Sequence, residues 1–129
     1  EPIGKMVLAT PKGDIHDLGK DIFATLLIGQ GFEVHDLGVD VDPSSITDKV
    51  REVKPDFVGF SVLITTAFAN MKKTTDMLEK EKLRDSFKLM VGGGVTNSVL
   101  KEHISADFQT IDAMEGVDYC LKQIKEKNL

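Results

Sequence analysis

The sequence predicts an α/β domain built on a doubly wound parallel sheet, and two observations lead to this prediction. Short apolar runs alternate with longer amphipathic runs along the chain, at about 25 residues per cycle. The run Phe57–Ser61 is nearly all apolar, as expected of a central strand covered on both faces. Alternating strands and helices joined by right-handed crossovers give a parallel sheet with helices on both faces.

Each of five cycles supplies one strand and one helix. The strands are expected at Lys5–Thr10, Phe32–Leu37, Phe57–Ser61, Lys88–Val91 and Asp107–Thr110. The helices are expected at Leu18–Gly29, between Asp42-Pro43-Ser44 and Pro55, and at Phe68–Lys82, Asn97–His103 and Met114–Lys127. Gly31 is typical of the glycine that follows a helix, and Asp42 or Ser44 is expected to cap the second helix.

Helical spacing gives each longer helix a face to bury. In the first helix we expect Ile22, Leu26 and Gly29 on that face, with Phe23 and Leu27 beside it. The corresponding residues are Ile46, Val50 and Val53 in the second helix, Met71, Thr75 and Leu78 in the third, and Val117, Cys120, Leu121 and Ile124 in the last.

The strand order 2-1-3-4-5 of flavodoxin-type, Rossmann-like folds suits these cycles. In this order the ligand crevice lies at the carboxyl ends of strands one, three and four. Three unusual loops follow those strands, namely Gly13–Gly19, Ser61–Thr66 and Gly92–Thr96. Hydroxyl side chains often cap helices and glycines often serve tight turns, but the convergence of all three loops favours a site for a bulky ligand.

The first loop holds the pair of residues with the most chemical information. Asp14 stands two residues before His16, with glycines on either side. A lone histidine in a loop is most often polar surface, and an aspartate before a helix is most often an N-cap. The same spacing is also typical of a metal ligand with the carboxylate that orients it, so both interpretations stay open on these residues alone.

Composition and charge argue against several classes of function. The net charge of −5 and the pI near 5.1 disfavour binding to nucleic acid or to anionic membranes. The chain has no apolar run of about 18 residues and no secretory signal, so we expect neither a membrane span nor export. The single Cys120 is expected in the core, and a cytoplasmic location fits its lack of a disulfide partner.

Three motifs taken together resemble the signature of a known family. Asp14-x-His16-x-x-Gly19, Ser61-x-Leu63 and Gly92-Gly93 are similar to the motifs of cobalamin (vitamin B12)-binding domains that hold the cofactor base-off and His-on. The resemblance runs from Gly4 to the last helix. Within that family, Gly13–Lys20 resembles the corrinoid methyl-carrier proteins and methionine synthase-like methyltransferases more than the isomerases.

The resemblance implies a role for each loop. His16 would bind cobalt as its lower axial ligand, and Asp14 would hold the other ring nitrogen; these two are the residues implied to be catalytic. Thr65 would make a polar contact near the corrin ring. The nucleotide tail of the cofactor would run between strands, beside Ser61, Leu63, Gly92 and Gly93. The cofactor-binding residues implied are Gly13, Asp14, Ile15, His16, Asp17, Leu18, Gly19, Ser61, Leu63, Thr65, Gly92, Gly93 and Gly94.

The function implied by the resemblance is that of a corrinoid protein, which carries a methyl group between partner methyltransferase subunits for donor and acceptor. Its cofactor would be cobalamin or a related corrinoid, which alternates between methylcobalamin and cob(I)alamin at the cobalt. A reductive activase would be a further partner. The chain would then be the carrier component of a methyltransferase system rather than a complete enzyme, with the identity of the methyl donor and acceptor left open.

Alternative functions remain on this fold. A cobalamin-dependent sensor or regulatory domain would have the same cofactor site. The small domain of an adenosylcobalamin mutase agrees less well with Leu18, where that subgroup has arginine. A receiver domain needs an acceptor aspartate at the end of the third strand, where this chain has Ser61.

The chain departs from the family pattern at two points. In methionine synthase-like domains a serine completes a His–Asp–Ser relay at the position that is Ala67 here, so Thr66 or a water molecule would have to replace it. Methyl carriers also have an N-terminal helical cap, and we expect none within this chain. Residues 1–129 are therefore expected to be one cobalamin-binding domain and a fragment of a longer protein.

Overall fold

Five parallel strands form the centre of the fold in a computed structural model, which describes residues 1–128. The strands are β1 (Lys5–Ala9), β2 (Glu33–Asp36), β3 (Phe57–Ser61), β4 (Lys88–Gly92) and β5 (Phe108–Thr110). They lie side by side in the order β2-β1-β3-β4-β5, and every neighbouring pair is parallel. The predicted fold class and strand order are therefore confirmed.

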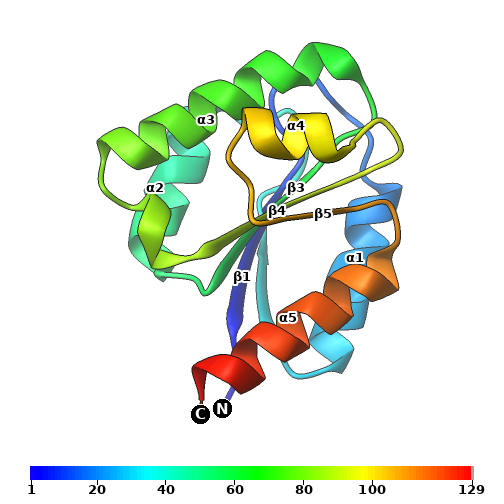
Figure 1. Cartoon of the computed structure of the whole chain (residues 1–129), viewed down its shortest axis with the longest axis vertical. Coiled ribbons are helices and arrows are strands. Elements are labelled where there is room, and N and C mark those ends of the chain that lie inside the picture. Colours follow the sequence, from blue (N-terminus) through cyan, green and yellow to red (C-terminus); the bar gives the residue numbers. More distant parts are fainter. Residues whose placement is uncertain (129) are drawn as a thin grey trace.

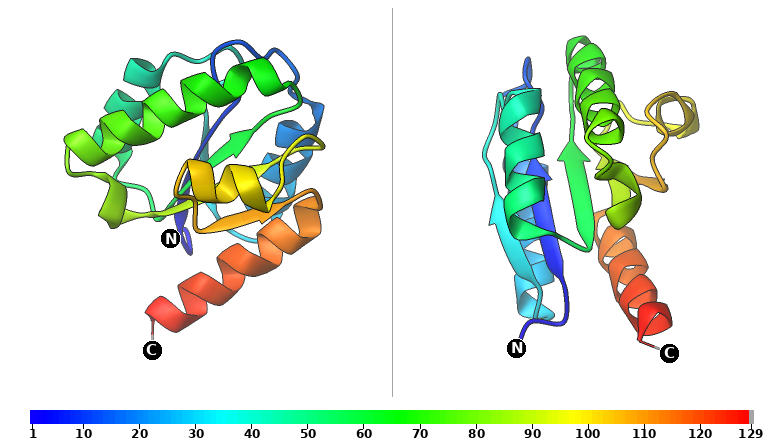
Figure 2. Two further views of the ribbon diagram at one scale, coloured as in Figure 1. Left: turned by 45° about the horizontal axis from the view of Figure 1, so that its top comes forward. Right: turned by 90° about the vertical axis from the view of Figure 1, so that its left-hand side faces the viewer.

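Helices cover both faces of this sheet (Figures 1 and 2). They are α1 (Leu18–Gly29), α2 (Pro43–Val53), α3 (Phe68–Lys80), α4 (Ser98–His103) and α5 (Ala113–Lys127), with short 3-10 turns at Thr65–Ala67 and Arg84–Ser86. α1 and α5 pack together on one face, and α2, α3 and α4 lie on the other. Among residues 1–128, no helix combines the length and the apolar composition needed to cross a membrane.

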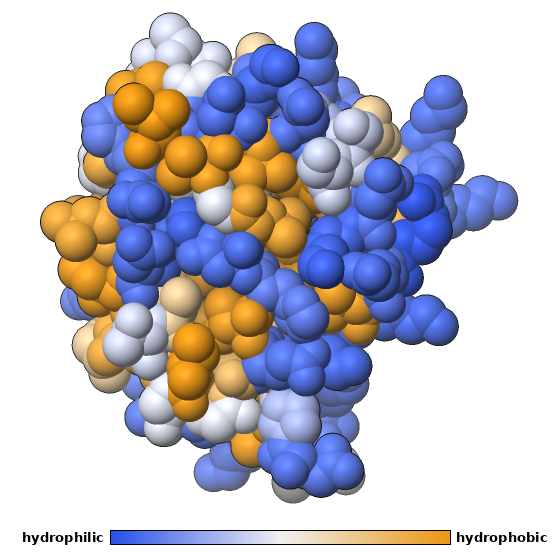
Figure 3. Space-filling model, turned by 180° about the vertical axis from the view of Figure 1, so that it is seen from behind, coloured by the Kyte–Doolittle hydropathy of each residue, from blue (hydrophilic) through white to orange (hydrophobic). Residues whose placement is uncertain are grey.

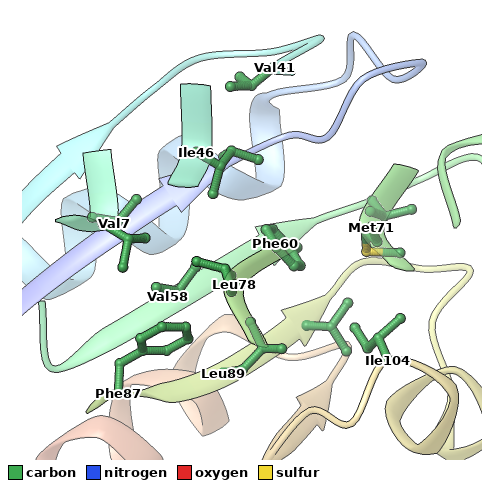
Figure 4. Packing of buried hydrophobic residues seen from close by; sticks show 14 of the residues in the cluster. Val7, Val41, Ile46, Val58, Phe60, Met71, Leu78, Phe87, Leu89 and Ile104 are labelled. Atoms are coloured by element: carbon green, nitrogen blue, oxygen red, sulfur yellow. The ribbon is translucent and has the colours of Figure 1, made fainter. Parts of the chain in front are cut away.

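The side chains of each central strand alternate between two cores. In β1, Met6 and Leu8 pack on the side of α1 and α5, while Val7 and Ala9 pack on the side of α2 and α3. Figure 4 shows the second core, where Ile46 from α2 points toward the apolar side chains of the strands. None of these four β1 residues is more than 2% exposed, as predicted for a strand covered on both faces.

The predicted element boundaries are right to within a few residues, and the differences have local causes. α3 ends at Lys80, earlier than predicted, because Lys82 adopts the left-handed conformation with φ of 61°. Asp42 takes the N-cap position of α2, but neither it nor Ser44 caps the helix with its side chain. The predicted N-cap position is therefore right for Asp42, but its carboxylate accepts a hydrogen bond from Lys12 Nζ and none from the backbone of the helix.

The face that α1 buries also differs from the prediction. Its buried residues are Lys20, Ala24 and Leu27, whereas Ile22 is 48% exposed and Gly29 is exposed. Apolar side chains therefore lie between polar ones on the surface of the molecule, as the view from behind in Figure 3 shows for one face. The prediction that Ile22 and Gly29 face the core is wrong.

The buried face of α1 includes the charged residue Lys20. Its side chain is 2% exposed, and Nζ lies 2.6 and 2.7 Å from the two carboxylate oxygens of Asp36 at the end of β2. A buried ammonium needs such a partner, and Asp36 supplies it on the face that α1 turns toward the sheet. Counting apolar residues could not place a lysine on the buried face.

The other predicted faces are confirmed. The buried residues include Ile46, Val50 and Val53 in α2, Met71, Thr75 and Leu78 in α3, and Val117 and Cys120 in α5, with Leu121 and Ile124 partly buried against the same core. Cys120 lies in the core as predicted, and burial raises the pKa of its thiol to about 12.

The observed buried face of α1 leads to a prediction about the free energy of unfolding. Leu27→Ala should lower the free energy of unfolding by about 2–5 kcal/mol, because Leu27 is fully buried and the change leaves a cavity. Ile22→Ala on the same helix should change it by only about 0.5 kcal/mol, since half of that side chain is in solvent. Urea unfolding of both variants measures the difference, and equal losses would contradict the assignment of the buried face.

Candidate functional site

The three loops predicted to form a crevice do converge at the carboxyl edge of the sheet. There, a cavity of about 140 Å³ lies between the sheet and the pair of helices α1 and α5. Five of the predicted site residues line it, namely Gly19, Ser61, Leu63, Gly92 and Gly93. The parallel pairing of β3 and β4 places Ser61 directly opposite Gly92, so the second and third loops leave the sheet side by side.

The buried carboxylate of Asp14 joins the first loop to the second. Oδ1 accepts hydrogen bonds from the backbone N–H of His16 at 2.9 Å and from the ring Nδ1 of His16 at 2.7 Å. Oδ2 accepts hydrogen bonds from the backbone N–H groups of Leu63 at 2.7 Å and Ile64 at 3.2 Å. Asp14 is therefore neither a helix cap nor a polar residue on the surface, because its fully buried side chain holds two loops at once.

The surroundings of Asp14 favour its charged form. Burial alone would raise the pKa of this carboxyl, but the hydrogen bonds from Leu63 N–H, from the backbone and ring of His16, and from Ile64 N–H outweigh it. Together they hold the pKa of Asp14 below its ordinary value of 3.8. The site therefore contains a permanent negative charge at neutral pH, directly behind the histidine ring.

His16 presents its second ring nitrogen outward from this anchor. Its side chain is 50% exposed, and Nδ1 is occupied by the Asp14 carboxylate. A carboxylate acceptor keeps the proton on Nδ1, which leaves the lone pair of Nε2 free to bind a metal. Within residues 1–128, Nε2 has no hydrogen-bond partner, so the arrangement is that of an oriented but unengaged imidazole.

The protein itself requires glycine at position 93, just after β4, and leaves little room beside Gly92, the last residue of β4. Gly93 has φ of 123°, and a Cβ atom there would lie 1.8 Å from the carbonyl oxygen of Val62. A Cβ atom on Gly92 would lie 3.2 Å from the carbonyl oxygen of Thr110. These glycines let the loop after β4 pass close against its neighbours, which forms the edge of the cavity.

The remaining predicted residues lie outside the cavity wall. Residues 13–18 form the loop beside it, with Asp17 at the N-cap position of α1 and the side chains of Ile15 and Leu18 more than 70% exposed. Thr65 is exposed in the 3-10 turn before α3, and Gly94 is exposed after β4. The structure brings the loops together as predicted, but these residues do not line the cavity.

Part of the cavity wall was missed by the sequence analysis. It comes from α1, the floor of the sheet and the start of α5, and it includes Lys20, Phe23, Met90, Thr110, Ile111, Asp112, Ala113 and Gly116. A Cβ atom on Gly116 would lie 3.0 Å from the Phe23 ring, so this glycine allows α5 to pack close to α1. The packing of α1 against α5 brings Phe23 and Gly116 together at the cavity, and no motif spacing encodes it.

No side-chain hydroxyl takes the place of the missing serine at position 67. Ala67 is fully buried. Within the described part of the chain, all four hydrogen bonds to the Asp14 carboxylate come from backbone N–H groups and from the His16 ring, and none comes from Thr66. Two backbone N–H groups of the second loop serve the carboxylate oxygen that points away from His16.

Comparison with known proteins identifies the class to which this fold and site belong. The family model described as the B12 binding domain matches residues 4–119, so the chain belongs to the B12-binding domain family. Its relatives are corrinoid proteins. The dimethylamine corrinoid protein of Methanosarcina barkeri is 41% identical over 115 residues, which are 89% of this chain and 54% of that protein.

Solved structures agree with this assignment. A cobalamin-binding protein from Desulfitobacterium hafniense DCB-2 superposes with a TM-score of 0.89 at 44% identity, covering 92% of this chain and 58% of the other. The methanol:cobalamin methyltransferase complex MtaBC from Methanosarcina barkeri contains a chain that superposes with a TM-score of 0.90 at 27% identity, covering 97% of this chain and 48% of the other. The chain thus spans about half the length of these relatives.

The charge of Asp14 predicts a pH dependence of stability. The pKa of Asp14 is lower in the folded chain than its ordinary value of 3.8. The ionised carboxylate therefore makes its full contribution to the free energy of unfolding above about pH 3.8, and this contribution is lost as the pH falls through the pKa of the folded chain. Asp14→Asn should have a lower free energy of unfolding than the unchanged chain at neutral pH, and the gap between these two free energies should narrow below about pH 4. Urea unfolding of both chains across this range measures the gap, and a gap independent of pH would contradict the prediction.

Proposed function

We propose that this chain is the cofactor-carrying domain of a corrinoid protein in a methyltransferase system, with cobalamin held base-off and His16 on cobalt. The observation that carries this proposal is the Asp14–His16 pair, joined at 2.7 Å beside an apolar cavity and leaving one imidazole nitrogen free. The family and the corrinoid relatives support it.

The cavity fits the apolar base of a displaced nucleotide tail. Its wall is mainly apolar, and two of its polar side chains already have partners: Lys20 pairs with Asp36, and the Thr110 hydroxyl donates a hydrogen bond to Glu115. Within residues 1–128, the Ser61 hydroxyl has no partner, so it is available to a ligand at this wall. Such a wall favours an aromatic ring system and gives little support to a charged group.

The residues of the chain would orient the cofactor and hold a proton. His16 would bind through Nε2, while Asp14 would keep the Nδ1 proton in place and raise the basicity of the ring. The bound corrinoid supplies a cobalt centre that accepts and releases a methyl group. Because the Asp14 carboxylate is fixed by Leu63 and Ile64, the imidazole would be oriented before any cofactor arrives.

The partners form part of the same proposal. A methyl carrier needs one methyltransferase subunit for the donor and one for the acceptor, together with a reductive activase, and the match to a chain of the MtaBC complex supports the methyltransferase part. We further propose that residues 1–129 are one domain of a longer protein with a helical cap, since the chain spans about half of its relatives, and that the system is cytoplasmic.

The first test of this proposal concerns the metal ligand. When the chain is loaded with cob(II)alamin, the EPR spectrum should show the splitting of a histidine nitrogen on cobalt, and His16→Ala should abolish that splitting. His35→Ala is the matched control, because His35 pairs with Glu33 in β2 and should leave the spectrum unchanged. Unaltered splitting in the His16 variant would exclude His16 as the ligand.

The second test concerns the tail. Ser61→Leu adds a large side chain to the cavity wall and should weaken cobalamin binding by about tenfold or more. It should leave unchanged the binding of cobinamide, a corrinoid without the nucleotide tail. Thr66→Leu, in the same loop but off the cavity wall, serves as control. Equal affinities of the Ser61 variant and the unchanged chain for cobalamin would contradict the placement of the tail.

A further inference from the structure

The loop between β2 and α2 contributes nothing to the cavity wall, yet it runs along the histidine loop. Thr10 N–H donates to Gly38 O, Val41 N–H donates to Thr10 O, and Lys12 N–H donates to Val41 O, all at 2.9–3.0 Å. An isolated parallel bridge joins Pro11 to Val41. The two loops therefore continue the pairing of β1 with β2 beyond the end of the sheet.

Asp40 makes the last contacts of this series, on either side of the peptide that joins Gly13 to Asp14. Its Oδ1 accepts a hydrogen bond from Gly13 N–H at 2.9 Å, and its own N–H donates to Asp14 O at 2.9 Å. We call these two hydrogen bonds the Asp40 clasp. The clasp holds the backbone immediately before His16 from the side opposite to Leu63 and Ile64.

The backbone of Asp40 is unfavourable for a residue with a side chain. Its φ is 53°, in the left-handed region, where aspartate and asparagine are tolerated better than most residues but still at a cost. The carboxylate contact with Gly13 offsets that cost. A conformation of this kind next to a functional loop points to a role in holding the loop.

We propose that Asp40 is a positioning residue for the cobalt ligand, because its clasp fixes the backbone from which Asp14 and His16 project. This inference rests on the proposed function of His16. Asp14 has its side chain held by the loop after β3 and its main chain held by the loop after β2. Without the clasp, the main chain of Gly13 and Asp14 keeps the hydrogen bond from Asp14 N–H to Pro11 O within its own loop but loses its link to the loop after β2. The Asp14 carboxylate, which contacts the His16 ring at 2.7 Å, is then positioned less firmly.

Two substitutions separate the side chain from the backbone. Asp40→Gly suits the left-handed conformation but removes the acceptor for Gly13 N–H. Asp40→Asn keeps an acceptor oxygen and tolerance of that conformation. Lys82→Gly controls for the general effect of a glycine, since Lys82 is also left-handed but lies between α3 and β4, away from the three loops.

The experiment measures the fraction of His-on cobalt in each chain loaded with cob(II)alamin, from the nitrogen splitting of the EPR spectrum. Asp40→Gly should lower the ratio of His-on to His-off by about tenfold, the effect of losing one hydrogen bond to a charged group. The ratio for Asp40→Asn should stay within about threefold of that for the unchanged chain. The ratio for Lys82→Gly should equal that for the unchanged chain. A full His-on population in Asp40→Gly would overturn the inference.

Failure of the proposed function and failure of the inference about Asp40 give different results. Failure of the unchanged chain to show any nitrogen splitting would overturn the proposed function itself, whereas a loss confined to Asp40→Gly supports the inference. If Asp40→Gly does not fold, amide exchange of Gly13 in the unchanged chain provides the test. Protection of that amide supports the clasp, and exchange at the unprotected rate overturns it.

Discussion

The geometry of the site depends on one buried carboxylate. A charged group removed from water must find hydrogen bonds within the protein, and Asp14 finds four, from two loops that are far apart in the sequence. Oδ1 serves the loop of His16 and Oδ2 serves the loop after β3. The cost of burying the charge is recovered only when both loops take their observed paths, so the carboxylate couples the two conformations.

Much of this arrangement could be predicted from the sequence. Parallel strands bring their carboxyl ends to one edge, so the order of the strands was enough to place the three loops together. The contact of Asp14 with His16 was also predictable, because a spacing of two residues lets a carboxylate reach the ring. The bonds to Leu63 and Ile64 were not, since they use backbone N–H groups that every residue except proline has.

The errors arose where charge or helix packing decided the outcome. The buried face of α1 was misjudged because the Lys20 side chain is buried and reaches Asp36 at the end of β2, whereas a hydrophobic pattern counts lysine as surface. The wall supplied by Phe23 and Gly116 was missed because it depends on how closely α1 approaches α5. Both features require a three-dimensional arrangement that local spacing does not contain.

The polar groups of the site fall into two sets, those that already have hydrogen-bond partners within the protein and those that have none. Within residues 1–128, the Asp14 carboxylate, the Lys20 ammonium and the Thr110 hydroxyl are engaged within the protein. His16 Nε2 and the Ser61 hydroxyl are not. A site whose other polar groups are already paired loses little conformational freedom when a ligand binds. Little of the binding free energy is then offset by the cost of ordering the loops.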